Sequence, residues 1–180
     1  MKKIITTALL LSVCACSTFA QKYFTKKGVT TFYSSTPVED IKATNKETSV
    51  LINTSENSIV CVMENTKFVF PKSLMQEHFN ENYMESDKYP KSSFTGTYNK
   101  KIDPAVDGKY TVTVSGKLSI HGTLKDVSVP ATIEVKSGQI IGHAVFKVKT
   151  KDYNIKIPTI VVSKVAEEIQ VTIDFTATKM

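Results

Sequence analysis

The sequence has no tryptophan and no arginine, and its three cysteines are Cys14, Cys16 and Cys61. Without arginine, a planar guanidinium clamp on a phosphate or carboxylate is excluded, and lysine must supply the positive charge. Cys61 is the single cysteine beyond residue 20, which excludes an internal disulfide in the chain that follows. That part of the chain must therefore be held together by packing and hydrogen bonds.

The apolar run near the N-terminus, from Ile4 to Val13, is shorter than the roughly 20 residues that cross a bilayer. Two lysines precede it, and Thr18-Phe19-Ala20 follows with small residues where a signal peptidase cleaves. We predict that residues 1–20 are a signal peptide cleaved after Ala20, and that residues 21–180 are one domain in the periplasm. The alternative is a lipoprotein signal that would acylate Cys16 and anchor the protein.

Lysine outnumbers the acidic residues, and 23 lysines against 17 acids give a net charge of +6. The lysines are scattered along the chain, and export separates the protein from most nucleic acid, so we exclude nucleic-acid binding. The simple interpretation is a solvated, lysine-rich exterior. A transient contact with an anionic membrane surface is the alternative.

Strict alternation dominates the second half of the sequence. From Tyr110 to Ile120 an apolar residue or glycine occupies every second position, which is typical of a half-buried strand. Further predicted strands lie at residues 29–34, 40–44, 48–53, 59–70, 127–135, 139–149 and 169–175. Short turns join them, and no second helix could cover a parallel sheet. We therefore predict an all-β fold, a single closed antiparallel barrel of about eight strands, in which closure removes exposed edges.

One short amphipathic helix is predicted near residues 73–83. Ser73 followed three residues later by Gln76 has the form of a capping box. The apolar stripe of this helix consists of Leu74, Met75, His78, Phe79 and Tyr83. We expect the helix to close one end of the barrel with this stripe turned inward.

Two motifs link this chain to a known family. The first is His78-Phe-Asn-Glu-Asn-Tyr-Met-Glu-Ser-Asp-Lys-Tyr-Pro90, followed by Ser93-Phe-Thr-Gly96; the second is Gly116-Lys-Leu-Ser-Ile-His-Gly122, followed by Lys125, Val127 and Pro130. From Val29 to Thr178 the sequence resembles the YceI-like family of secreted bacterial lipid- and polyisoprenoid-binding proteins. The resemblance implies a lipocalin-like barrel with an elongated apolar cavity that takes an isoprenoid tail.

By this resemblance and by the alternation, we expect ligand-binding side chains inside the barrel. The expected lining residues are Phe32, Phe68, Phe70, Leu74, Phe79, Met84, Phe94, Val114, Leu118, Phe146 and Tyr153. Lys88, Tyr89 and Lys125 are the candidates to meet a polar head group at the mouth. A barrel of about eight strands is wide enough either to fill itself with side chains or to hold one slim ligand. Without the resemblance, Met and Phe residues at these spacings are better explained as plain core.

The predicted function is binding of an amphiphilic lipid with a long polyisoprenoid-like or fatty tail, as a periplasmic carrier or storage protein and not as an enzyme. The alternative is an enzyme acting on a lipid in the same cavity, with Glu85 and Asp87 as an acid pair. A binder needs an apolar lining and a polar mouth, whereas an enzyme needs convergent titratable groups inside. No catalytic residue or cofactor is expected, and the three histidines lack the spacing of a metal site.

Overall fold

Eight strands form the framework of the chain in a computed structural model, which describes residues 21–180. The strands are β1 (Lys22–Ser35), β2 (Asp40–Asn53), β3 (Ser58–Glu64), β4 (Lys91–Tyr98), β5 (Gly108–Ile120), β6 (Thr123–Lys136), β7 (Gln139–Lys149) and β8 (Glu168–Lys179). The helical segments are η1 (Asn65–Lys67), α1 (Ser73–His78), η2 (Phe79–Tyr83), η3 (Thr150–Tyr153) and η4 (Thr159–Lys164). The predicted signal peptide, with its cleavage after Ala20 or acylation at Cys16, lies outside the described residues.

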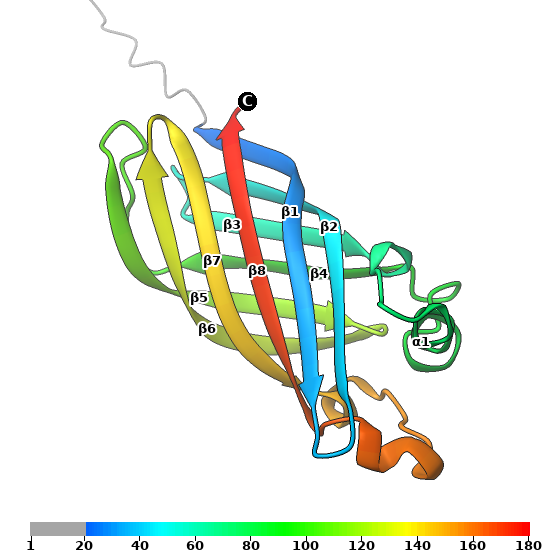
Figure 1. Cartoon of the computed structure of the whole chain (residues 1–180). Helices are drawn as coiled ribbons and strands as arrows, with labels where there is room; N and C mark the ends of the chain where they lie inside the picture. The colour runs from blue at the N-terminus through cyan, green and yellow to red at the C-terminus, as the bar shows by residue number, and fades with distance from the viewer. Residues whose placement is uncertain (1–20) are drawn as a thin grey trace, which may run out of the picture.

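Each strand pairs antiparallel with the next along the chain, and β8 returns to pair with β1, which closes the barrel (Figure 1). In the closing ladder Val29 lies opposite Asp174 and Tyr33 opposite Gln170. Closure pairs the two outer strands of the sheet, which would otherwise expose unpaired backbone groups. The predicted fold, a single closed antiparallel barrel of eight strands, is confirmed.

The first half of the barrel departs from the predicted strand boundaries. The segments predicted at 40–44 and 48–53 are one strand, β2, and the strand predicted at 59–70 ends at Glu64. The polar stretch inside β2 resembled a turn because of its composition. Its side chains are instead bonded within the barrel: Asn45 Nδ2 donates to the Glu64 carbonyl at 2.9 Å, and the hydroxyls of Thr48 and Thr30 lie 2.7 Å apart.

The wall of the barrel is not paired along its whole length between β6 and β7. Their ladder ends at Ala131 and Ala144, although β6 begins at Thr123 and β7 continues to Lys149. Pro130 precedes Ala131 and has no N–H to donate, so the ladder cannot continue through it. Residues 123–130 of β6 and 145–149 of β7 are therefore not paired with each other, at the end of the barrel where η3 lies.

The other end of the barrel is filled with side chains. Val50, Ile52 and Ile140 are fully buried there, and the β4–β5 loop adds Ile102 to the same cluster. Tyr98 also belongs to it; its hydroxyl finds no hydrogen-bond partner among residues 21–180, and burial raises the pKa of Tyr98 to about 12. This end of the barrel is a conventional apolar core.

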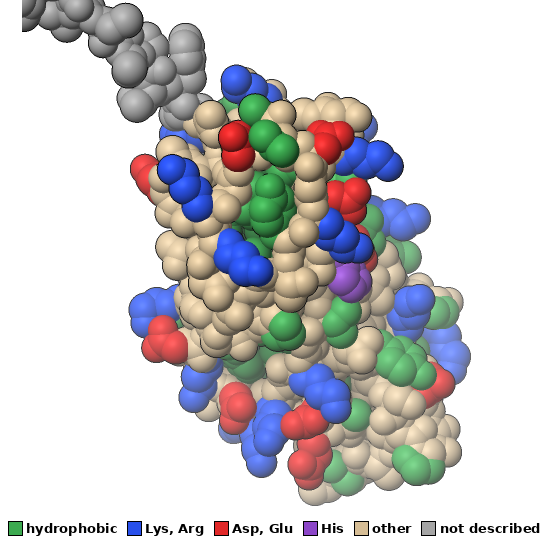
Figure 2. Space-filling model, turned by 90° about the vertical axis from the view of Figure 1, so that its left-hand side faces the viewer, with side chains coloured by type: hydrophobic (Ala, Val, Ile, Leu, Met, Phe, Trp, Pro, Cys, Tyr) green, Lys and Arg blue, Asp and Glu red, His purple; other side chains and the backbone are tan. Residues whose placement is uncertain are grey.

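The outer surface mixes charges of both signs. Figure 2 views the side that lies on the left in Figure 1, and lysine and acidic side chains are interspersed over it. Ion pairs such as Lys117 with Asp126 at 3.0 Å and Lys147 with Glu168 at 3.2 Å are exposed. Exposed ion pairs contribute little to the stability of the fold. The main effect of these surface charges is to favour solubility.

The long connection between β3 and β4, which carries α1 and η2, is closed at its base by one buried side chain. Asn65 Nδ2 donates to the Tyr89 carbonyl at 2.7 Å, and Asn65 Oδ1 accepts from the Ser92 hydroxyl at 2.9 Å. The backbone N–H of Asn65 donates to the Pro90 carbonyl at 2.8 Å. Because these bonds join the two ends of the connection, they hold the helical segment against the barrel.

The predicted helix is confirmed in extent, from Ser73 to Tyr83, as an α-helix that continues into a π-helical turn. The predicted capping box is wrong. Lys72 occupies the N-cap without a side-chain bond, and Gln76 Oε1 instead accepts from the backbone N–H of Phe70 at 3.2 Å. The reason is that Ser73 is already helical, so Gln76 bonds to the preceding segment. Within residues 21–180 no helix is long and apolar enough to span a bilayer.

Replacing Asn65 with alanine should lower the free energy of unfolding by about 2–3 kcal/mol, because the part-buried Tyr89 carbonyl and the buried Ser92 hydroxyl would both lose a partner. Urea denaturation measures the change. Asn82→Ala is the matched control, since Asn82 is exposed on η2. An equal loss of stability in both variants would contradict the role assigned to Asn65.

Candidate functional site

The end of the barrel opposite the filled core encloses a cavity of about 480 Å³. That volume falls in the range of small-molecule sites, roughly 300–1,000 Å³. Apolar side chains from the strands, from α1 and η2, and from the β7–β8 connection make most of its wall. The exposed members of the wall, which mark the opening, include Lys72, Leu74 and Lys164.

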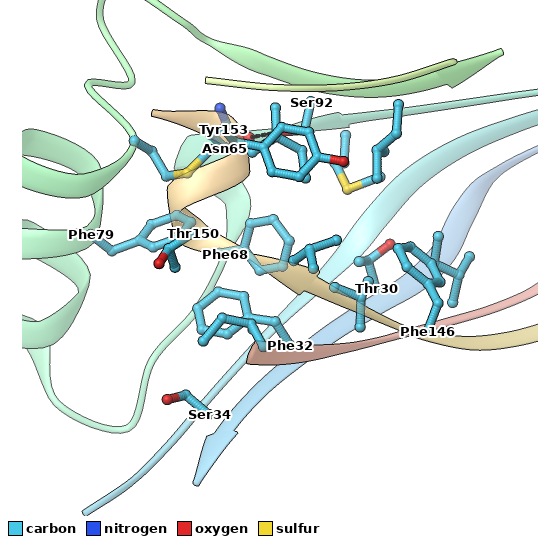
Figure 3. A pocket seen from close by; sticks show the side chains of 18 of the residues that line it. Thr30, Phe32, Ser34, Asn65, Phe68, Phe79, Ser92, Phe146, Thr150 and Tyr153 are labelled. Carbon is cyan, nitrogen blue, oxygen red and sulfur yellow. Dashed lines mark hydrogen bonds between the residues drawn. The ribbon is translucent and has the colours of Figure 1, made fainter. Parts of the chain in front are cut away.

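Four phenylalanine rings attach the helical segment to the barrel wall. Phe32 lies on β1 and Phe79 on η2, and Phe68 and Phe70 lie between η1 and α1. Phe32 and Phe79 contact each other, and both contact Phe68 and Phe70, with ring centroids 5.0 to 5.6 Å apart. Figure 3 shows Phe32, Phe68 and Phe79 pointing toward one another from different segments. Most of these pairs are tilted or edge-on, which adds to the stabilisation by burial. The cluster therefore both fixes the helical segment and forms part of the cavity wall.

Four buried polar side chains of the wall, those of Thr30, Ser34, Asn65 and Ser92, are already bonded to protein groups. Asn65 and Ser92 bond to each other, as the dashed line in Figure 3 shows. Thr30 bonds to Thr48, and the Ser34 hydroxyl oxygen accepts from the backbone N–H of Ala166 at 2.9 Å. Because these donors and acceptors are satisfied, an apolar chain can fill the cavity without stripping a polar group of its partner.

All of the lining residues expected from the sequence border this cavity. They are Phe32, Phe68, Phe70, Leu74, Phe79, Met84, Phe94, Val114, Leu118, Phe146 and Tyr153. Leu74 differs from the others because it is 58% exposed at the opening. That these side chains bind a ligand stays a prediction. The sequence analysis missed the contribution of the β7–β8 connection, where Ile157, Val161 and Val165 recur at every fourth position along the wall.

The three residues predicted to meet a head group do not border the cavity, so their placement at its mouth is wrong. The Tyr89 ring packs on His121 with centroids 4.6 Å apart, and Lys88 Nζ lies 4.9 Å from the centre of the Tyr89 ring. Lys125 is exposed on β6. The reason is the bond from Asn65 to the Tyr89 carbonyl, which places this loop over the β5–β6 turn. The lysines that do border the cavity are Lys72, Lys149 and Lys164.

A histidine joins three segments at this end of the barrel. His121 Nε2 lies 2.7 Å from Glu85 Oε2, and Nδ1 lies 3.1 Å from the Tyr153 carbonyl oxygen. The carboxylate and the carbonyl are both acceptors, so the imidazole ring bridges two acceptor groups from different segments. The His121 side chain is only 9% exposed. These contacts hold η3 in place, and with it the buried Tyr153 in the cavity wall.

The titratable groups inside the wall are kept neutral by burial. Cys61 on β3 is 4% exposed and borders the cavity, and desolvation raises the pKa of its thiol to about 12. Burial also raises the pKa of the Tyr153 hydroxyl. A thiol with such a pKa is a poor nucleophile at neutral pH. Residues 21–180 contain no group of three or more His, Cys, Asp or Glu side chains placed to hold a metal ion.

The fold and the cavity define a class: an eight-stranded, closed antiparallel barrel of the lipocalin-like type, filled at one end and hollow at the other. Within that class the chain belongs to the YceI-like family, because the YceI-like domain matches residues 20–177. No curated protein matches the chain.

Solved structures share this fold at low sequence identity. A polyisoprenoid-binding domain from Saccharophagus degradans aligns with a TM-score of 0.77 at 14% identity, covering 90% of this chain and 100% of that one. BcnA from Burkholderia cenocepacia aligns with a TM-score of 0.71 at 19% identity, covering 84% of this chain and 97% of its own. The YceI protein of Campylobacter jejuni aligns with a TM-score of 0.56 at 18% identity, covering 99% and 92%.

Cys61 should resist alkylation by iodoacetamide at pH 8 in the folded protein, about a thousandfold more slowly than after unfolding in urea, because burial raises its pKa and blocks access. Mass spectrometry of the peptide that contains Cys61 measures the rate. A Thr95→Cys variant is the control, because Thr95 is exposed on the neighbouring strand β4. If Cys61 were labelled as fast as the thiol introduced by Thr95→Cys, the cavity wall would be open to solvent.

Proposed function

We propose that this protein binds an amphiphile with a long apolar tail inside the hollow end of its barrel and acts as a carrier or storage protein. The observation that carries the proposal is the cavity itself: its wall is apolar, and its buried polar side chains are bonded to protein groups. Membership in the YceI-like family supports a polyisoprenoid-like or fatty tail as the ligand. The name of the Saccharophagus degradans domain points in the same direction.

The tail would be held by burial of apolar surface. Each methylene moved from water into the cavity contributes about 0.8 kcal/mol, so a long chain binds tightly without specific hydrogen bonds. The affinity in such a binding mode depends on the length and width of the chain more than on its chemical groups. It therefore accommodates both isoprenoid and fatty-acyl chains.

A head group would lie at the opening, where the cavity is bordered by lysines. Lys72 is paired with Glu39 at 3.1 Å and Lys149 with Glu168 at 3.6 Å. Lys164 makes no ion pair with any residue from 21 to 180 and is exposed. We propose Lys164 as the contact for an anionic head group, acting as a point charge.

A non-catalytic role is supported by where the titratable groups lie. The buried ones in the wall, Cys61 and Tyr153, are neutral at physiological pH; Lys72 and Lys164 stand at the opening, and His143 is bonded to Asp174. Glu85 of the acid pair considered for an enzyme is bonded to His121 instead. Catalysis requires convergent acid, base or nucleophile groups around the bound substrate, and this wall has apolar side chains there.

Phe146→Lys should weaken binding of a fluorescent prenyl or fatty-acyl probe by about tenfold or more, because it places a charged head in the apolar wall. Val145→Lys is the matched control, since Val145 is the next residue along β7 and is 39% exposed. Probe titration measures both, with circular dichroism to verify the fold. Native mass spectrometry of the protein from its own host should show one bound lipid per chain. A protein that is empty and takes up no probe would refute the proposal.

We also propose export to the periplasm with cleavage after Ala20. The expected mature N-terminus is then Gln21 without modification, as read by mass spectrometry of protein from the producing cell. Acyl chains on Cys16 would replace this proposal with the anchored alternative.

A further inference from the structure

Exposed apolar side chains gather around the opening of the cavity. They are Val38 in the β1–β2 turn (60% exposed), Leu74 on α1 (58%), and Ile160 and Val162 on η4 (86% and 59%). We call these four residues the rim. In Figure 1 the β1–β2 turn, α1 and the orange η4 lie toward the same end of the barrel, away from the C-terminus. Exposed apolar side chains gathered in one region mark a surface that meets a partner.

The segment around η4 faces both the cavity and the solvent. Ile157 and Val161 border the cavity, whereas Ile160 and Val162 are exposed on the outside. A chain leaving or entering the cavity at this point would pass from one apolar surface directly to the other. The rim is therefore continuous with the cavity wall.

Positive charge flanks this apolar segment. Lys156 and Lys164 stand on its two sides; no acidic residue occurs from Tyr153 to Ala166, and the nearest acids along the chain are Asp152 and Glu167. Neither lysine forms an ion pair with the described part of the chain. Apolar side chains between free lysines are the pattern of segments that insert among lipid head groups, since the lysine stems lie along the apolar layer while the ammonium groups meet phosphate.

Acidic side chains near the opening do not cancel this charge. Glu39 borders the cavity and is paired with Lys72 at 3.1 Å. Glu77 and Glu81 border a separate shallow hollow on the helical segment, together with Ser73, and do not border the cavity. The side of the molecule that carries η4 is therefore the side suited to an anionic surface.

We propose that the rim docks on the surface of an anionic phospholipid bilayer, so that the cavity opens toward the membrane. The rim surrounds an opening instead of forming a continuous patch, and a fluid bilayer can contact such a ring at every point. A ligand with a long apolar tail is nearly insoluble in water, so exchange at a bilayer avoids exposing the tail; this step rests on the proposed function. The charge pattern of η4 supports docking independently of what the cavity holds.

Flotation with vesicles tests the docking. The protein should bind vesicles of equal parts phosphatidylcholine and phosphatidylglycerol, bind vesicles of phosphatidylcholine alone more weakly, and lose affinity as salt is raised. The double variant Ile160→Ser, Val162→Ser should bind about tenfold more weakly. Lys156→Gln and Lys164→Gln should each weaken binding about fivefold.

Two controls separate docking from ligand binding. Val106→Ser removes an exposed apolar side chain of similar exposure (56%) from the β4–β5 loop at the filled end, and it should leave vesicle binding unchanged. Uptake of a water-soluble short-chain fluorescent fatty acid reports on the cavity alone. The rim variants should retain this uptake, whereas Phe146→Lys should lose it and still float with vesicles.

Absence of binding to anionic vesicles, or equal losses in the rim variants and in Val106→Ser, would overturn the docking proposal and leave the proposed function standing. Self-association that the rim variants abolish, without vesicle binding, would overturn it as well, because the rim would then meet a second copy of the chain. Normal vesicle binding by a protein that takes up no fatty acid would support docking and refute the proposed function.

Discussion

Closure of the barrel by the β1–β8 ladder is the constraint on which the other features depend. It fixes the number of strands at eight and turns every second side chain toward one enclosed interior. An interior of this width can be filled by side chains or can leave room for one slim ligand. The protein does both, one at each end, and this division explains how a hollow barrel without a disulfide among its described residues keeps a stable fold.

The filled end and the hollow end are held together by different contacts. Aliphatic side chains such as Ile52 and Ile140 pack against one another at the filled end. The hollow end is bordered by two long connections, each held by polar contacts at its base: Asn65 for the β3–β4 connection and His121 for the β7–β8 connection. At the hollow end the phenylalanine cluster adds to these polar contacts and holds the helical segment against the wall.

The hollow end is suited to an apolar ligand because its buried polar groups bond to protein and its buried titratable groups are neutral. Cys61 and Tyr153 illustrate the second point, since burial raises the pKa of both. Charge is confined to the opening, where lysines and the apolar rim lie together. An amphiphile likewise has an apolar tail and a polar head, and a bilayer has an apolar interior beneath polar head groups. The proposed ligand and the proposed docking surface therefore match the same arrangement of apolar and charged groups in the protein.

The sequence by itself determined the barrel and the helical segment, because both depend on periodicity. The alternation from Tyr110 to Ile120 sets which side chains point inward, and the resemblance to the YceI-like family selected a cavity over a filled core. Only the tertiary structure decided which end is hollow, how the β3–β4 loop lies and where the charges meet the opening. Lys88 and Tyr89 were misplaced, and the capping role of Gln76 was wrong, because loop paths depend on contacts between residues distant in sequence, such as Asn65 with Tyr89 and His121 with Tyr153. Local patterns fix the direction of a side chain; the position of a connection is fixed by the partners it finds after the barrel has closed.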